Sequence, residues 1–162
     1  MSDFDRAFEI ILKEEGGLST DPRDPGGVTK YGIAQKFYPA LDIPNLTKED
    51  AKAIYFTDYW MPVRANELPW PLCLYVFDCA VNQGVPTAVR LLQESLGVRI
   101  DGKFGPVTLQ AARAVSARGM ARFMAIRARR YAVTTNFNIY GTGWFTRLFT
   151  VTHAGATSES ST

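Results

Sequence analysis

The apolar positions near the start of the chain repeat at the interval of a helix. At about 100° per residue, one stripe is formed by Phe4, Phe8 and Ile11. Ser2, followed by Asp5 three residues later, resembles a capping box, which predicts that the helix begins beside Ser2. Glu15 continues the apolar stripe at the far end of this helix, whereas Glu14 is expected to point toward solvent.

The segment from Leu18 to about Gln35 is too rich in glycine and proline for a helix. Its last part, residues 27–33, has the residues of a short strand or hairpin. A short helix around residues 33–37 is a further option. We therefore expect a small β element within residues 18–35, beside a cleft.

The remaining apolar patterns predict helices. Thr47 with acids after it marks one N-terminus, and residues 69–83 are nearly all apolar, which predicts a central buried helix. Pro86 begins another helix, which Gly97 ends, and two more follow from Pro106 to about residue 134, broken near residues 118–119. The fold class is therefore mainly α, with at least six helices. The small polar residues 154–162 are expected to form a disordered tail.

The two halves of the chain carry opposite charge. Residues 1–83 have a net charge of −5 and residues 84–154 a net charge of +8. This asymmetry suggests an anionic partner for the basic half. Its arginines are equally well explained as a solvated face paired with acidic neighbours; those in question are Arg118, Arg122, Arg127, Arg129 and Arg130.

Several classes of protein are disfavoured by composition. No apolar run reaches about 18 residues, so no membrane insertion is expected, and the first residues lack the form of a signal peptide. We therefore expect a cytoplasmic protein until something releases it. Cys73 and Cys79 are expected to be free core thiols. With His153 as the single histidine, neither a metal nor another cofactor is predicted.

The chemistry most readily predicted lies between the first helix and the following loop. A carboxyl group at the edge of an apolar surface is poorly hydrated, which favours its protonated form and makes Glu15 a candidate general acid. Asp24 lies among proline and glycine, where it should stay ionised as a general base or electrostatic partner, and Thr29 can hold a water molecule. The ordinary alternative is a solvated glutamate at a helix end followed by a surface loop.

The same stretch carries a resemblance. The stretch begins with Glu15-Gly16-Gly17 and continues with Asp-Pro-x-Asp-Pro-Gly-Gly-x-Thr-x-x-Gly-Ile over residues 21–33. It resembles the signature of glycoside hydrolase family 108, the N-acetylmuramidases of phage endolysins and of secretion-associated muramidases. The order Glu, Asp, Thr is also similar to the catalytic triad of phage-type lysozymes, with the same Glu-to-Asp spacing. Thr29 comes one residue earlier here than the threonine of those lysozymes.

Further motifs extend the resemblance to about residues 4–149. They are Phe77-Asp78 with Ala80-Val81-Asn82 and Gly84, the Asp-Gly-x-x-Gly-Pro-x-Thr of residues 101–108, also found in peptidoglycan-binding modules, and the Gly-Trp-x-x-Arg of residues 143–147. The resemblance implies a lysozyme-like fold in three parts. These are a catalytic lobe over residues 1–85, a basic helical lobe over residues 86–153 resembling a peptidoglycan-binding module, and the tail over residues 154–162.

Polar residues on the apolar helix of residues 69–83 allow two interpretations. Asp78 and Asn82 can cap or bridge the backbone, or Asn82 and Gln83 can face the cleft and bind sugar amides. We place Asn82 and Gln83, together with Tyr31, among the candidate substrate-binding residues.

The resemblance implies a lysozyme activity on the β-1,4 bond between N-acetylmuramic acid and N-acetylglucosamine, carried by Glu15, Asp24 and Thr29. The expected partner is peptidoglycan, with no nucleic acid, and the protein is expected to be a monomer that acts on periplasmic peptidoglycan. A phage endolysin is the favoured role. The alternatives are a lytic transglycosylase, a bacterial muramidase assisting secretion and, remotely, a non-catalytic helical binder of nucleic acid.

Overall fold

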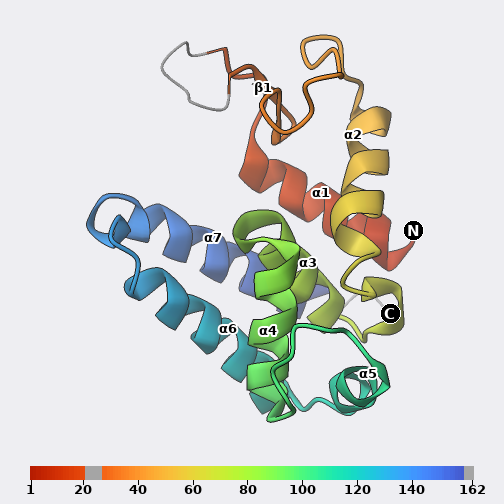
Figure 1. The fold of residues 1–162 in the computed structure, drawn as a ribbon, viewed down its shortest axis with the longest axis vertical. Coiled ribbons are helices and arrows are strands. Elements are labelled where there is room, and N and C mark those ends of the chain that lie inside the picture. Colours follow the sequence, from red (N-terminus) through yellow and green to blue (C-terminus); the bar gives the residue numbers. More distant parts are fainter. Residues whose placement is uncertain (21–26, 159–162) are drawn as a thin grey trace.

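The computed structural model describes residues 1–20 and 27–158, and most of them are helical (Figure 1). The seven α-helices of the described residues confirm the mainly α, lysozyme-like class predicted from the sequence. They are α1 (Asp3–Glu15), α2 (Lys48–Tyr55), α3 (Leu72–Gln83), α4 (Val85–Leu96), α5 (Pro106–Arg113), α6 (Ala117–Ala132) and α7 (Phe137–Thr157). A π-helical turn over Phe56–Trp60 continues α2, and a 3-10 turn covers Ala65–Glu67.

Helix α1 begins and packs as its sequence predicts. The Ser2 hydroxyl accepts the Asp5 backbone N–H at 3.1 Å, and the Asp5 carboxylate accepts the Ser2 backbone N–H at 3.0 Å. This reciprocal pair satisfies two amide groups that a helix N-terminus otherwise leaves without partners. Thr47 and Asp50 cap α2 in the same way. The apolar stripe of α1 is buried against α3.

The β element is a hairpin of strands β1 (Thr29–Lys30) and β2 (Ile33–Ala34). Its turn residues Tyr31 and Gly32 have φ angles of 51° and 76°, the left-handed pair that a type I′ turn requires. Ser19 pairs with Thr29 through two backbone hydrogen bonds of 2.7 and 2.9 Å, which tie the chain after α1 to the hairpin. The short helix suggested around residues 33–37 is wrong: β2 is followed by turns, because the pairing with β1 keeps residues 33–34 extended.

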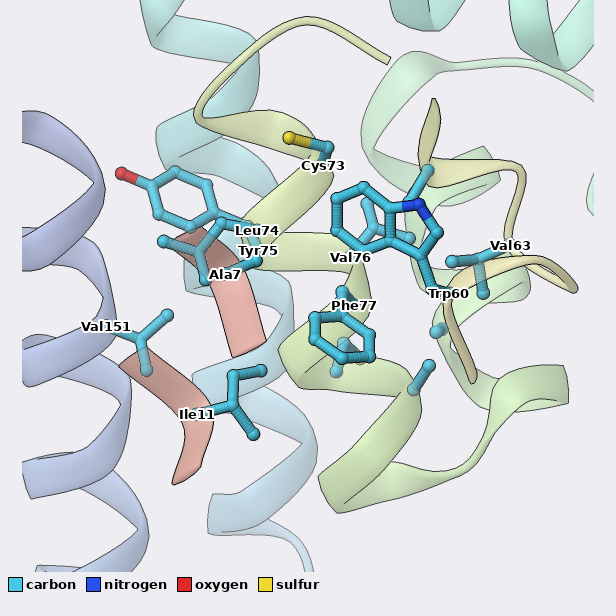
Figure 2. Packing of buried hydrophobic residues seen from close by; sticks show 14 of the residues in the cluster. Ala7, Ile11, Trp60, Val63, Cys73, Leu74, Tyr75, Val76, Phe77 and Val151 are labelled. Atoms are coloured by element: carbon cyan, nitrogen blue, oxygen red, sulfur yellow. The ribbon is translucent and has the colours of Figure 1, made fainter. Parts of the chain in front are cut away.

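Helix α3 forms the centre of the molecule, as its apolar run predicts. Every residue from Leu72 to Ala80 is buried, and the helix contacts α1, α4, α6 and α7. Ala7 and Ile11 of α1 and Val151 of α7 lie around Phe77 and its neighbours on α3 (Figure 2). Cys73 and Cys79 are free and buried within this core, as expected. The proposed division at residue 85 stays a prediction, and α3 contacts helices on both sides of it.

Two predicted boundaries in the C-terminal half are wrong. The break between α5 and α6 lies at residues 114–116 and not near Arg118-Gly119, because the Ser116 hydroxyl accepts the Gly119 N–H and caps a helix that already includes both residues. The tail expected to be disordered from Ala154 is helical through Thr157, and Gly155 is buried against Tyr75 and Pro71. Residues 159–162 lie outside the described part.

No helix within residues 1–20 and 27–158 is long and apolar enough to cross a membrane.

Candidate active site

Glu15 is the last residue of α1, and its side chain is held by the far end of the chain. The helix ends there because Gly16 takes a φ of 76°, which leaves the right-handed helical region. Arg147 of α7 donates through Nη1 to Glu15 Oε1 at 2.6 Å. The Glu15 side chain is 20% exposed and that of Arg147 is 10% exposed, so the contact is mostly shielded from water while part of the Glu15 side chain stays exposed.

Behind this contact lies a buried network of charges that joins four helices. Arg147 Nε donates to Asp78 Oδ1 at 2.9 Å, and Arg127 Nη2 donates to Asp78 Oδ2 at 2.8 Å. Arg127 Nε in turn donates to Gln83 Oε1 at 3.0 Å. The side chains of Asp78 and Arg127 are fully buried. The network therefore connects Glu15 to the end of α3 through side chains alone.

The charge of Arg147 is fixed by this network. Burial by itself lowers the pKa of the Arg147 guanidinium, but the carboxylates of Asp78 and Glu15 outweigh burial and raise that pKa above its ordinary value. Among the described residues, Arg147 Nη2 makes no hydrogen bond, although it lies 2.9 Å from Asp78 Oδ1. Arg147 is thus a permanent cation that contacts Glu15 through Nη1 and Asp78 through Nε and Nη2.

Glu14 does not point freely to solvent as the helical spacing predicts. It is partly buried, and this burial raises the pKa of its carboxyl group; the charges of Asp78 and Glu15 act in the same direction and that of Arg147 against it. The reason is the packing of α7 and α3 around the end of α1, which covers more than the apolar stripe. A Glu14 variant is therefore unsuitable as an inert control for Glu15.

The hairpin packs directly on Glu15. A methyl group placed on Gly32 would lie 3.0 Å from both Cβ and Cγ of Glu15, so the turn touches the stem of this side chain. The Tyr55 hydroxyl donates to the Tyr31 carbonyl oxygen at 2.9 Å and fastens the turn to α2. The site therefore brings together a helix end, a tight turn and an arginine from α7.

The structure places the other predicted site residues of the loop as follows. Thr29 lies on β1, partly buried, and its hydroxyl donates to the Gly27 carbonyl oxygen at 3.4 Å. Tyr31 forms the turn, with Lys30 Nζ 5.5 Å from its ring centroid. Asp24 lies outside the described residues. The roles predicted for Asp24, Thr29 and Tyr31 stay predictions.

Asn82 and Gln83 end α3 on the side of this network. The Tyr131 hydroxyl donates to Asn82 Oδ1, and Gln83 Oε1 accepts from Arg127 as well as from the Cys79 thiol at 3.4 Å. Asp78 and Asn82 thus bond to side chains of α6 and α7, and the interpretation that they cap or bridge the backbone is wrong. Asn82 and Gln83 also line a surface pocket of about 200 Å³.

Sequence reasoning missed the partners of Glu15. Arg127 was assigned to an exposed or functional basic face, yet it is fully buried. The available signal was its spacing: Arg127 lies four residues after Phe123 and four before Tyr131, both buried, and therefore on the inner face of α6. Arg147 enters the sequence analysis only as the last residue of the Gly-Trp-x-x-Arg motif.

The molecule is mainly helical, and a glutamate ends its first helix beside a β hairpin, with an arginine paired to the carboxylate. This is the architecture of a lysozyme-like glycoside hydrolase. Comparisons with known proteins agree with this class. The glycosyl hydrolase 108 family matches residues 8–84, and a predicted peptidoglycan domain matches residues 87–148. The search of curated proteins gave no match.

Among solved structures, SagA of Brucella abortus is similar over 98% of this chain and 97% of that chain, with 30% sequence identity and a TM-score of 0.84. The chain belongs to glycosyl hydrolase family 108, and it is a peptidoglycan hydrolase. The resemblance deduced from residues 15–33 is thereby confirmed.

Proposed function

We propose that this protein is an N-acetylmuramidase that cleaves the β-1,4 bond between N-acetylmuramic acid and N-acetylglucosamine. The observation that carries the proposal is the position of Glu15, a partly exposed carboxyl group held between the Gly32 turn and Arg147. A single orientation of this group is what proton transfer to a glycosidic oxygen requires.

In the proposed reaction, Glu15 gives its proton to the glycosidic oxygen while the bond from that oxygen to the anomeric carbon breaks. The N-acetylglucosamine chain leaves as an alcohol. A water molecule, held by Thr29 and deprotonated by Asp24, forms the new bond to the anomeric carbon. Arg147 stabilises the carboxylate that remains on Glu15 after the transfer, because its charge lies 2.6 Å away.

A lytic transglycosylase is the second candidate, since it also needs one acidic glutamate. In that reaction the 6-hydroxyl of the muramic acid replaces water, and the product is an anhydro sugar. The Asp24 and Thr29 pair favours hydrolysis, because a transglycosylase has no water to activate. Mass spectrometry of the digest separates the two: hydrolysis gives reducing muramic acid ends, and anhydro ends would exclude the muramidase.

The test of Glu15 is zymography on purified cell walls with Glu15→Gln. The amide keeps the shape of the side chain but has no proton to transfer, so we expect activity to fall by about 10²–10⁴-fold. Glu9→Gln is the matched control, because Glu9 is exposed on the same helix and pairs only at the surface with Lys48. Retention of more than a few per cent of the activity would exclude Glu15 as the general acid.

We further propose a role as a phage endolysin, with a secretion-associated muramidase as the alternative; both would act on periplasmic peptidoglycan after release from the cytoplasm. The support is the resemblance of residues 15–33 to the signature of a family that includes phage endolysins and secretion-associated muramidases. Expression in a Gram-negative host should be tolerated until chloroform permeabilises the membrane, when lysis should follow within minutes. Spontaneous lysis during expression would contradict this.

A further inference from the structure

The pocket at the end of α3 lies at the junction of the two matched segments. Asn82 and Gln83 come from the glycosyl hydrolase segment, and the other lining residues come from the peptidoglycan-domain segment. Those others are Arg130, Tyr131, Thr134 and Trp144. Glu15 is absent from this lining, so the pocket is separate from the proposed general acid.

Two side chains of the pocket, Arg130 and Gln83, offer hydrogen-bond donors that are not used within the described residues. Arg127 carries no acceptor, so the bond it gives to Gln83 fixes Oε1 toward Arg127 and leaves the Gln83 amide nitrogen without a partner among the described residues. Arg130 is exposed, and within residues 1–20 and 27–158 it forms no ion pair or hydrogen bond. No acidic side chain lines the pocket. A ligand that accepts hydrogen bonds and carries negative charge fits this arrangement.

The apolar wall of the pocket is rigid. The rings of Tyr131 and Trp144 are stacked, with centroids 5.2 Å apart and an interplanar angle of 21°. The Tyr131 hydroxyl is fixed by Asn82, and the Thr134 hydroxyl donates to the Tyr131 carbonyl oxygen at 2.8 Å. This wall therefore offers a preformed surface for a carbon chain.

The pocket is also close to the reaction centre. Trp144 and Arg147 are three residues apart on α7, so they lie on neighbouring turns of one helix face. From the other side, Gln83 bonds to Arg127, which begins the network that ends at Glu15. A substrate with its scissile bond at Glu15 thus has a substituent within reach of the pocket.

From these observations we infer that the pocket binds a carboxylate of the stem peptide attached to muramic acid, with Arg130 as the charged contact and Gln83 as a second donor. This inference rests on the proposed muramidase function. It assigns the pocket to the peptide because a neutral sugar ring has no negative charge to match Arg130, whereas stem peptides carry carboxylates. The stacked aromatic wall would then lie against the aliphatic part of the peptide.

The test compares two glycan fragments that differ only in their stem peptides, one with free carboxylates and one with the same carboxylates converted to amides. We expect Arg130→Gln to raise KM on the free-carboxylate fragment by about threefold to tenfold, the size of a partly exposed charge-assisted contact, with kcat unchanged. On the amidated fragment Arg130→Gln and wild type should have equal KM.

Arg122→Gln is the matched control, since Arg122 is an exposed arginine on the same helix that lines a different hollow. It should behave as wild type on both fragments. An equal loss on both fragments, or no change in KM on either, would overturn the carboxylate assignment. Failure of the wild type to cut either fragment would instead reject the muramidase proposal itself, so the two failures are distinguishable.

Discussion

Helix α1 carries ion pairs at its outer face and at its C-terminal end, and the two places differ in burial more than in geometry. On the outer face, Lys48 of α2 lies 2.6 Å from Glu9, with side chains 42% and 48% exposed. At the end, Arg147 lies 2.6 Å from Glu15 with most of both side chains covered. The distances are equal, but only the second pair continues into a buried network through Asp78.

The difference shows why contact distance is a poor guide to the energy of an ion pair. The charges of an exposed pair are hydrated whether or not they touch, so such a pair contributes only about 0–1 kcal/mol to the stability of the fold. Members of a buried network have given up that hydration, and removing one leaves an uncompensated charge in the interior. The outer Lys48–Glu9 pair fastens α2 to α1 weakly, whereas the inner network fixes the position of the proposed acid.

The largest expected effect comes from Asp78→Asn. Arg127 would remain fully buried opposite a neutral amide, and we expect the free energy of unfolding to fall by about 3–5 kcal/mol. Urea denaturation monitored by circular dichroism measures this. Glu94→Gln is the control, because its partner Arg129 is 65% exposed, and it should cost no more than about 1 kcal/mol. Equal losses in the two variants would contradict the distinction drawn from burial.

Gly32→Ala tests the contact between the hairpin turn and Glu15. The added methyl group meets first the Tyr55 hydroxyl, which holds the turn, and then the Glu15 stem at 3.0 Å. Alanine is also strained at a φ of 76°, at a cost of about 1–2 kcal/mol. Because a shift of about 1 Å in a reacting group can lower the rate by about a hundredfold, we expect activity to fall by up to that factor.

Gly143→Ala is the matched glycine control, since its added methyl group would meet no atom within 4 Å in the middle of α7. It should raise stability by about 0.5–1 kcal/mol through the better helix propensity of alanine and leave cell-wall lysis unchanged. An active Gly32→Ala variant would show that the turn does not position Glu15.

Lys48→Met measures the outer pair with Glu9. The loss of stability should be at most about 1 kcal/mol at low salt, and it should disappear in 1 M NaCl because salt screens exposed charges. Thermal melts at the two salt concentrations give this comparison. A loss that persists in high salt would place this pair with the buried network.

The smallest effect is expected from Glu14→Gln. Because burial raises the pKa of Glu14, its charge opposes folding above the carboxyl pKa of the unfolded chain, and this penalty vanishes when acid protonates both states. The variant should therefore be slightly more stable than wild type at pH 7, by less than about 0.5 kcal/mol for a partly exposed group, and equal to it below about pH 4. Urea denaturation at pH 7 and pH 3.5 checks the sign.

The sequence by itself determined the local structure. Spacing and turn chemistry predict features that depend on residues within a few positions of one another. These features are both capping boxes, the apolar stripe of α1, the central α3 and the hairpin. The family motif around Glu15 likewise indicated the class of enzyme, because its signature is contiguous. The boundary of α6 was wrong because the local cap Ser116 starts the helix, whereas Gly119, three residues later, suggested a break.

Only the tertiary structure decided what surrounds Glu15. Arg147 is 132 residues away in the chain and Asp78 is 63 away, and no periodicity connects residues on three separate helices. Arginines look alike in sequence whether they lie in water or in the core, so buried Arg127 and exposed Arg130 could not be told apart by charge. Their difference comes from how α6 packs on α3 and α7, because that packing removes water from one face of the helix and leaves it on the other.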